Sequence, residues 1–257
     1  MKALTLRIAT YNLQKCVGLD LRRRPDRSLA VLESTGADLV VLQEADKRMP
    51  PRPAALPDEM AEANGWQVAD LGEPGGSLGW HGNAFLLRGK SRVLDTGHIE
   101  LPGLEPRGAI RVDLDTPIGP LRVIGVHLGL LRRYRLLQVA AIRRAIDRLP
   151  VWPTVIAGDF NDWGDMQALQ SHLGPYRIQP SRGSFPAPRP IAALDRFAIG
   201  PGLQPGEPTP HIAQPARIAS DHLPVWIDIA ATPAVAALAP ARRRGHSAQA
   251  PDRDRLQ

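Results

Sequence analysis

The feature of this sequence that most constrains its fold is a series of short apolar runs separated by stretches with helical spacing. Each run is four to seven residues long, which is typical of a strand, whereas a helix needs about 10 or more residues. The runs predict strands at 6–11, 39–42, 84–87, 110–114, 121–127, 154–157, 194–199 and 225–229. Strands interleaved with helices indicate a layered α/β or α+β domain, and so many strands indicate two packed sheets.

Helical spacing predicts helices at about 27–35, 58–64 and 132–149, with a short one after Trp163. The third is the clearest, because one face carries residues at three-or-four spacing, namely Leu131, Tyr134, Gln138, Ala141, Ile142, Ala145 and Leu149. The opposite side carries mainly arginines, namely Arg132, Arg133, Arg143, Arg144 and Arg148. The pattern predicts an amphipathic helix with a solvated arginine face.

Composition supports a soluble globular protein, since 43% of the residues are hydrophobic and 23% are charged. No apolar run approaches the roughly 20 residues of a membrane-spanning helix, so no membrane insertion is expected. Arg7 interrupts the N-terminal stretch before it reaches the roughly 7 to 15 apolar residues of a signal peptide. The single cysteine, Cys16, can form no internal disulfide. We therefore expect a cytoplasmic protein.

The net charge of +6 favours a polyanionic partner, such as nucleic acid or an anionic membrane surface. Half of that charge lies in residues 232–257, which hold five arginines and two aspartates. This segment is rich in Pro, Ala and Arg and has no usable period, so we expect a disordered tail after a folded domain at 1–231. The basic charge is therefore as well explained by composition as by function.

Six polar clusters lie at or just beyond one end or the other of the predicted strands. They are Asn12, Glu44, His127, the pair Asp159 and Asn161, Asp195, and the pair Asp221 and His222. One carboxylate after a strand is usually a cap or turn former, and one histidine is usually structural. Together, however, they supply hard oxygen ligands and imidazoles, which suit Mg²⁺ or Mn²⁺ and suit structural zinc poorly. The inventory indicates phosphoryl chemistry.

Two residues of the run 155–163 share a predicted orientation. If the chain stays extended beyond the strand, Asp159 and Asn161 point to the same side and both address one water or phosphate oxygen. Phe160 then faces the core.

The ordered motifs of the chain resemble those of the endonuclease/exonuclease/phosphatase superfamily. They run from TYN, LQE, GNAFLL and RGA through VHLG, GDFND and LDRF to SDHLPV, over residues 6 to 229. The resemblance implies a DNase I-like, four-layer α/β sandwich, in which two mixed sheets pack face to face with helices outside. It also implies divalent-metal-dependent hydrolysis of phosphate esters by in-line attack of water, with Mg²⁺ or Mn²⁺ as the cofactor.

The resemblance also assigns roles to the motif residues. It gives Asn12 and Glu44 to the metal, and gives Asp221 to a second metal or to the shape of the first site. Asp159 would orient or activate the attacking water, and Asn161 would position the phosphate. Asp195 would orient His222, and His127 would donate a hydrogen bond to a phosphate oxygen. Asn83 and Arg107 are expected as substrate contacts, or else as a loop cap and a solvated arginine respectively.

The substrate is less constrained than the chemistry. Gln14 and His81 replace residues frequent in relatives, a histidine and an aromatic, so substrate preference does not transfer directly. We favour a nucleic-acid phosphodiester, because Arg132, Arg133 and Arg135 follow closely after His127 and could guide a polyanion. A phospholipid or another small phosphodiester is the alternative. A non-catalytic nucleic-acid-binding module is more remote, since clustered acids repel phosphate. The oligomeric state is left open.

Overall fold

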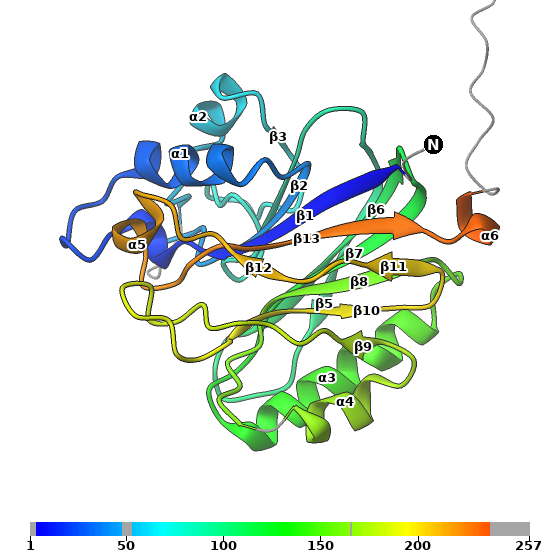
Figure 1. Ribbon diagram of the computed structural model, residues 1–257. Coiled ribbons are helices and arrows are strands. Elements are labelled where there is room, and N and C mark those ends of the chain that lie inside the picture. Colours follow the sequence, from blue (N-terminus) through cyan, green and yellow to red (C-terminus); the bar gives the residue numbers. More distant parts are fainter. Residues whose placement is uncertain (1–3, 48–52, 165, 237–257) are drawn as a thin grey trace, which may run out of the picture.

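Two β-sheets lie face to face with helices on their outer surfaces in the computed structural model, which describes residues 4–47, 53–164 and 166–236 (Figure 1). The first sheet has the order β11–β13–β1–β2–β4–β3, with β12 paired to β13. Its strands are β1 (Thr5–Asn12), β2 (Leu39–Gln43), β3 (Gln67–Val68), β4 (Ala84–Leu87), β11 (Leu203–Pro205), β12 (Thr209–Pro210) and β13 (Val225–Ala231).

The second sheet has the order β5–β6–β7–β8–β10–β9. Its strands are β5 (Arg92–Glu100), β6 (Gly108–Thr116), β7 (Gly119–His127), β8 (Thr154–Asp159), β9 (Arg177–Ile178) and β10 (Asp195–Ile199). Both sheets are mixed, because β1 pairs in parallel with β2 and β7 with β8, while the other pairs are antiparallel. A helix crosses between the strands of each parallel pair, as parallel connections require.

The helices complete four layers, as the family resemblance implies. The first sheet is covered by α1 (Pro25–Thr35), α2 (Asp58–Ala63) and α5 (Ala216–Ala219), and the second by α3 (Arg132–Asp147) and α4 (Gln167–Leu173) (Figure 1). A short 3₁₀ turn, η1 (Gln14–Cys16), follows β1, and α6 (Pro233–Ala236) follows β13. Among the described residues, no helix is long and apolar enough to cross a membrane.

Burial on both faces explains why the strands are nearly continuous apolar runs. In β1, Ile8 faces the core between the sheets, whereas Ala9 and Tyr11 face the layer of α1 and α5. In β8, Val155 and Ala157 likewise face the central core, and Ile156 packs toward α3. Helices on the outer faces therefore remove the apolar–polar alternation that a half-exposed strand would show.

Strand β5 is absent from the sequence-based prediction. It lies at the edge of its sheet, where most of its side chains are exposed or half-buried and only Ile99 is buried. Such a strand carries no apolar run, so its sequence gives no recognisable signal.

The end of the chain also differs from the prediction. The proposed tail begins at 232, but residues 232–236 belong to the described structure, where α6 places Val235 against Gly202. The remainder of the predicted tail, 237–257, lies outside the described residues.

The buried face of α3 is rotated from the predicted one. Val139 and Ile146 are buried together with the expected Gln138 and Ile142, whereas Leu131 is 50% exposed. Leu131 precedes the helix in an extended conformation, so it does not continue the helical stripe. The pattern therefore predicted the helix correctly but not its orientation.

Candidate active site

Strand register brings the predicted polar residues into two rows. In the second sheet, His127 of β7 pairs with Asp159 of β8, which pairs with Asp195 of β10. In the first sheet, Asn12 pairs with Gln43, and Glu44 follows directly. Because β1 and β8 pack against each other across the sandwich, both rows open at the same end of the molecule.

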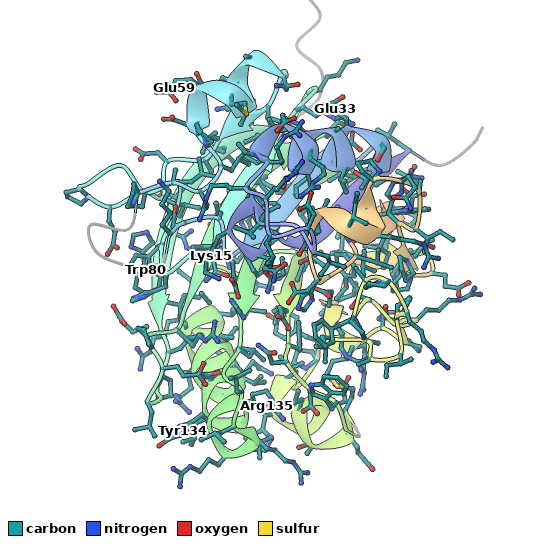
Figure 2. The ribbon with its side chains drawn as sticks, turned by 90° about the vertical axis from the view of Figure 1, so that its left-hand side faces the viewer. Lys15, Glu33, Glu59, Trp80, Tyr134 and Arg135 are labelled. Atoms are coloured by element: carbon teal, nitrogen blue, oxygen red, sulfur yellow. The ribbon has the colours of Figure 1, made fainter. Side chains whose placement is uncertain are left out.

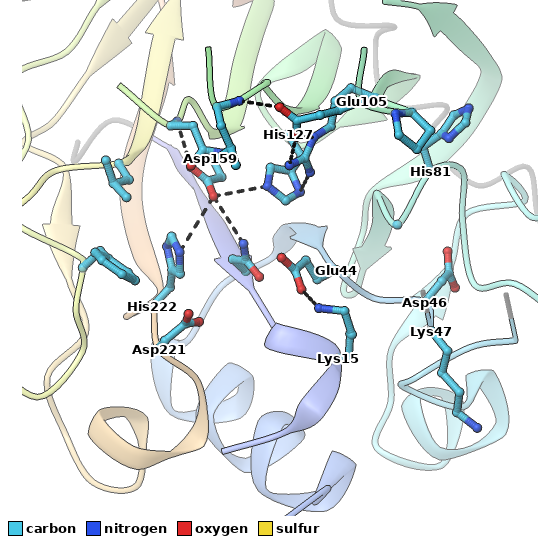
Figure 3. Close-up of a pocket in the computed structure, with 18 of the residues that line it drawn as sticks. Lys15, Glu44, Asp46, Lys47, His81, Glu105, His127, Asp159, Asp221 and His222 are labelled. Atoms are coloured by element: carbon cyan, nitrogen blue, oxygen red, sulfur yellow. Dashed lines mark hydrogen bonds and ion pairs between the residues drawn. The ribbon is translucent and has the colours of Figure 1, made fainter. Parts of the chain in front are cut away.

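These rows line one cavity of about 480 Å³ (Figure 3). Eight of the ten predicted site residues contribute to its walls, namely Asn12, Glu44, Arg107, His127, Asp159, Asn161, Asp221 and His222. Asp195 lies behind the wall and is fully buried. Asn83 also lies outside the cavity, so of its two expected roles the loop cap fits this structure better than the substrate contact. Its buried amide instead donates to the carbonyls of Trp80 and Gly108.

His222 is held from behind by a buried acid. Its Nδ1 lies 2.9 Å from Asp195 Oδ2, which is the contact expected from the motifs. Burial acts to lower the pKa of His222, but the charge and hydrogen bond of Asp195, with the charges of Asp159 and Asp221, outweigh it and raise the pKa to about 10. The imidazole is therefore positively charged at neutral pH, with Nε2 facing the cavity.

A serine that sequence reasoning did not identify supports this pair. Ser184 Oγ donates to Asp195 Oδ2 at 2.6 Å and is completely buried. It lies in a proline-rich loop without a motif of its own, so only the fold reveals the contact.

Asp159 lies at the centre of the cavity floor. Its Oδ2 accepts a hydrogen bond from Asn12 Nδ2 at 3.2 Å and lies 3.5 Å from His127 Nε2 and 3.8 Å from His222 Nε2. Burial, followed by the charge of Asp195, raises the pKa of Asp159 to about 7, against the opposing effects of His222, Asn161 and Asn12. Such a carboxyl exchanges a proton readily near neutral pH.

The turn after β8 is not extended as predicted. Asn161 has φ 50°, because its backbone N–H donates to Asp159 Oδ1 at 2.9 Å and its Nδ2 donates to Leu128 O at 2.9 Å. Asp159 and Asn161 nevertheless face the same cavity, and Phe160 is buried as expected.

Backbone strain is concentrated around this cavity. Of the seven described non-glycine residues with positive φ, four line it, namely Lys15, Glu44, His81 and Asn161. Residues in this conformation cost about 1–3 kcal/mol each and persist where the surrounding structure imposes them, often at functional sites. The strain agrees with a site whose side chains are positioned for chemistry.

The oxygen-rich side of the cavity attracts a cation. Lys15 lies near the middle of the face shown in Figure 2, and its ammonium forms an ion pair with Glu44 Oε2. Burial raises the pKa of Asp221, and the nearby charge of Glu44 raises it further. In the described part of the chain no three His, Cys, Asp or Glu side chains group tightly enough to hold a metal alone. Mg²⁺, however, takes one or two carboxylates together with waters and substrate phosphate, so Asn12, Glu44 and Asp221 fit it.

The arginines after His127 do not form the expected guiding patch. Arg135 is buried, donates to the carbonyls of Gly129 and Leu130, and pairs with Asp162 at 3.4 Å. Arg132 and Arg133 are exposed but do not line the cavity. Arg135 therefore supports the loop between β7 and α3, because its charge is already neutralised.

Aromatic side chains form another part of the cavity wall. Trp163 is 63% exposed, and its ring meets Phe185 edge to face at 5.7 Å. The Phe185 ring lies 4.9 Å from that of His222. Asp162 Oδ1 accepts a hydrogen bond from Gly164 N and thereby holds the turn that carries Trp163. The cavity thus offers an aromatic surface beside its charged groups.

Comparison with known proteins identifies the fold. A family model described as the endonuclease/exonuclease/phosphatase family matches residues 9–222, which include both rows of site residues. The chain belongs to this family. Members of the family generally use divalent metals, so membership agrees with the cation-attracting side of the cavity.

One sequence relative of this endonuclease/exonuclease/phosphatase protein matches part of its length. YbhP of Escherichia coli K12, itself uncharacterized, is 31% identical over 162 residues, which cover 59% of this chain and 63% of YbhP. The chain therefore matches less than two thirds of that relative's length.

Solved structures share the fold at low identity. The mannosyl-6-phosphatase Bt3783 of Bacteroides thetaiotaomicron has a TM-score of 0.70 at 17% identity, covering 87% of this chain and 99% of that chain. The D. rerio TDP2 complexed with single strand DNA product has a TM-score of 0.68 at 16% identity, covering 88% and 98%. The chain thus has the phosphoesterase fold of its family.

Proposed function

We propose that this protein is a divalent-metal-dependent phosphodiesterase that cleaves nucleic acid by in-line attack of water. The observation that carries the proposal is the arrangement of Asp159 between two histidines, with the carboxylates Glu44 and Asp221 on the walls of the same cavity. A phosphate placed there meets a charged imidazole, a hydrogen-bond donor and a group able to take a proton.

The charges of the side chains suit them to distinct steps. Asp159 lies beneath the reacting centre, where its carboxyl would orient the attacking water and accept a proton. His222, charged through its pairing with Asp195, would donate from Nε2 to the leaving oxygen or to a phosphate oxygen. Asn161 Nδ2 donates one of its two hydrogens to Leu128 O, and the other hydrogen would position the phosphate.

Asn12, Glu44 and Asp221 would hold Mg²⁺ or Mn²⁺, which would supply neutralisation of phosphate charge. With the ion bound, Lys15 would no longer be needed as the partner of Glu44, and its ammonium would be available to the substrate.

The preference for nucleic acid rests on the aromatic wall. Bases stack on exposed aromatic rings at about 1–3 kcal/mol per base, and Trp163 offers such a ring next to Phe185 and His222. A family fold bound to a single strand DNA product agrees with this preference. A small phosphoester is the second candidate, since the same fold occurs in a mannosyl-6-phosphatase.

The test is hydrolysis by the purified chain, with Mg²⁺, Mn²⁺ or EDTA, of single-stranded and plasmid DNA, RNA, phospholipid vesicles and a chromogenic phosphodiester. Asp159→Ala and His222→Ala should each lower kcat by about 100-fold or more, because proton transfer in the transition state contributes about 10²–10⁴-fold. The matched controls Glu62→Ala and His172→Ala change exposed residues outside the cavity and should retain full activity.

The outcomes separate the alternatives. Metal-dependent cleavage of nucleic acid that weakens steeply with salt supports the proposal. Turnover of phospholipid vesicles or small esters, without turnover of nucleic acid, would contradict the proposed substrate but support the proposed phosphodiesterase reaction. Metal-free nucleic-acid binding without turnover of any ester would indicate a binding module, and equal activity in wild type and both active-site variants would overturn the mechanism.

A further inference from the structure

The second histidine of the cavity has a fixed proton arrangement. Arg107 Nη1 lies 2.9 Å from His127 Nδ1 (Figure 3). A guanidinium has five N–H donors and no acceptor, so His127 Nδ1 must accept this hydrogen bond. An imidazole that accepts at Nδ1 carries its proton on Nε2. The identity of the partner therefore determines the tautomer of His127.

The guanidinium of Arg107 is itself held in place. Glu105 Oε2 accepts from Arg107 Nε at 3.0 Å and from Nη2 at 2.7 Å, and Glu105 Oε1 accepts from the backbone N–H of Leu130 at 2.9 Å. A planar guanidinium bound through two nitrogens by one carboxylate has little freedom to rotate. The third nitrogen of Arg107 consequently stays directed at His127.

The protonated nitrogen of His127 points to the reaction site. His127 is 4% exposed, and Nε2 lies 3.5 Å from Asp159 Oδ2. Burial, followed by the charges of Arg107, His222 and Lys15, lowers the pKa of His127 well below its ordinary value, in agreement with a neutral ring. His127 thus presents one donor, Nε2–H, toward Asp159.

We propose that Arg107 is a positioning residue that holds His127 as the neutral Nε2–H tautomer, and that Glu105 aligns Arg107 for this purpose. In this arrangement His127 donates from Nε2 to a phosphate oxygen without exchanging its proton. The kinetic consequence rests on the proposed phosphodiesterase function, but the tautomer is a property of the free protein.

The direct test is the ¹⁵N NMR spectrum of the His127 ring in the metal-free, full-length protein. The wild type should show a protonated Nε2 and an unprotonated Nδ1. Arg107→Ala should produce a mixture of tautomers, and added guanidinium at low concentration should restore the wild-type spectrum. Glu105→Gln should shift the spectrum in the same direction to a smaller extent. The matched control Arg144→Ala removes an exposed arginine of α3 and should leave the spectrum unchanged.

Kinetics separate positioning from substrate binding. Arg107→Ala should lower kcat by about 10²-fold, as removal of one oriented transition-state donor does, with little change in KM. A proton on Nδ1 in the wild type, an unchanged His127 spectrum in Arg107→Ala, or a rise in KM alone would each overturn the proposal. If Arg107→Ala does not fold, the wild-type spectrum and Glu105→Gln decide it. Absence of phosphodiesterase activity would remove the proposed function and leave the NMR result standing.

Discussion

The ring of His222 is charged because a buried acid lies behind it, and this pairing links stability to pH. The pKa of His222 in the folded protein is about 10, above the ordinary value of about 6.5 for an unfolded chain. The folded state therefore binds the proton more tightly. The resulting stabilisation is complete below about pH 6.5 and is lost as pH rises through 10.

We therefore expect the free energy of unfolding of the metal-free protein to fall by a few kcal/mol between about pH 6.5 and 10. In His222→Gln the fall over this window should be much smaller, whatever the overall stability of the variant. His172→Gln, at an exposed site, should keep the wild-type slope. Urea unfolding at a series of pH values measures the slope, and equal slopes for wild type and His222→Gln would contradict the assignment.

Contacts between residues were predictable only where a motif carried them. The motifs LDRF and SDHLPV predicted the contact of Asp195 with His222, which the structure contains. Ser184 belongs to no motif. Its hydrogen bond to Asp195 depends on the path of the loop between β9 and β10. Arg107 was expected to touch substrate or solvent, and its bond to His127 depends on how β6 and β7 meet, which no local pattern encodes.

At the scale of elements, the packing of α3 supports both the second sheet and the loop beside the cavity. Its inner face packs on the second sheet through Ile142, which is 1% exposed among Ile124, Ile156 and Leu173. The loop before α3 follows His127, the last residue of β7, and Gln138 Oε1 accepts from the backbone N–H of Gly129 in that loop at 2.8 Å. The helix thus stabilises the sheet and holds the loop behind the cavity.

Ile142→Ala should lower the free energy of unfolding by about 2–5 kcal/mol, because it leaves a cavity between α3 and the sheet. Leu137 lies on the same helix but is 52% exposed, so Leu137→Ala should change stability by no more than about 0.5 kcal/mol. Chemical denaturation of the two variants measures the difference. Similar losses in both would mean that α3 is not oriented as the structure has it.

The elements that form the core were the most predictable, because burial on both faces gives β1, β2, β7 and β8 apolar runs that stand out from their surroundings. The edge strand β5 and the two-residue strands β3, β9 and β12 were not predicted, since their pairing depends on a neighbour and not on their own composition. The orientation of α3 was missed for a related reason, as Leu131 is apolar but precedes the helix.

On the scale of the whole molecule, the site forms because the parallel strands of both sheets, β1 with β2 and β7 with β8, have their carboxyl ends at the same end of the sandwich. Asn12 and His222 are 210 positions apart in sequence yet line one cavity with Asp159. Apolar runs predict the strands, and the ordered motifs supplied the four layers through the family resemblance, but the order of the strands in each sheet comes from the structure alone. Family membership thus establishes the architecture, and the charges and hydrogen bonds of this chain support the chemistry proposed for its cavity.

The central claim is that this junction of sheets binds a divalent cation beside a phosphate site. It is tested most directly by anomalous diffraction from crystals of the protein soaked with Mn²⁺ and a slowly hydrolysed phosphodiester. We predict one strong anomalous peak against Glu44, with Asn12 and Asp221 nearby, and a phosphate within hydrogen-bonding distance of His127 and His222. Absence of Mn²⁺ from the cavity under conditions that support hydrolysis, or a metal and phosphate bound elsewhere, would contradict the account.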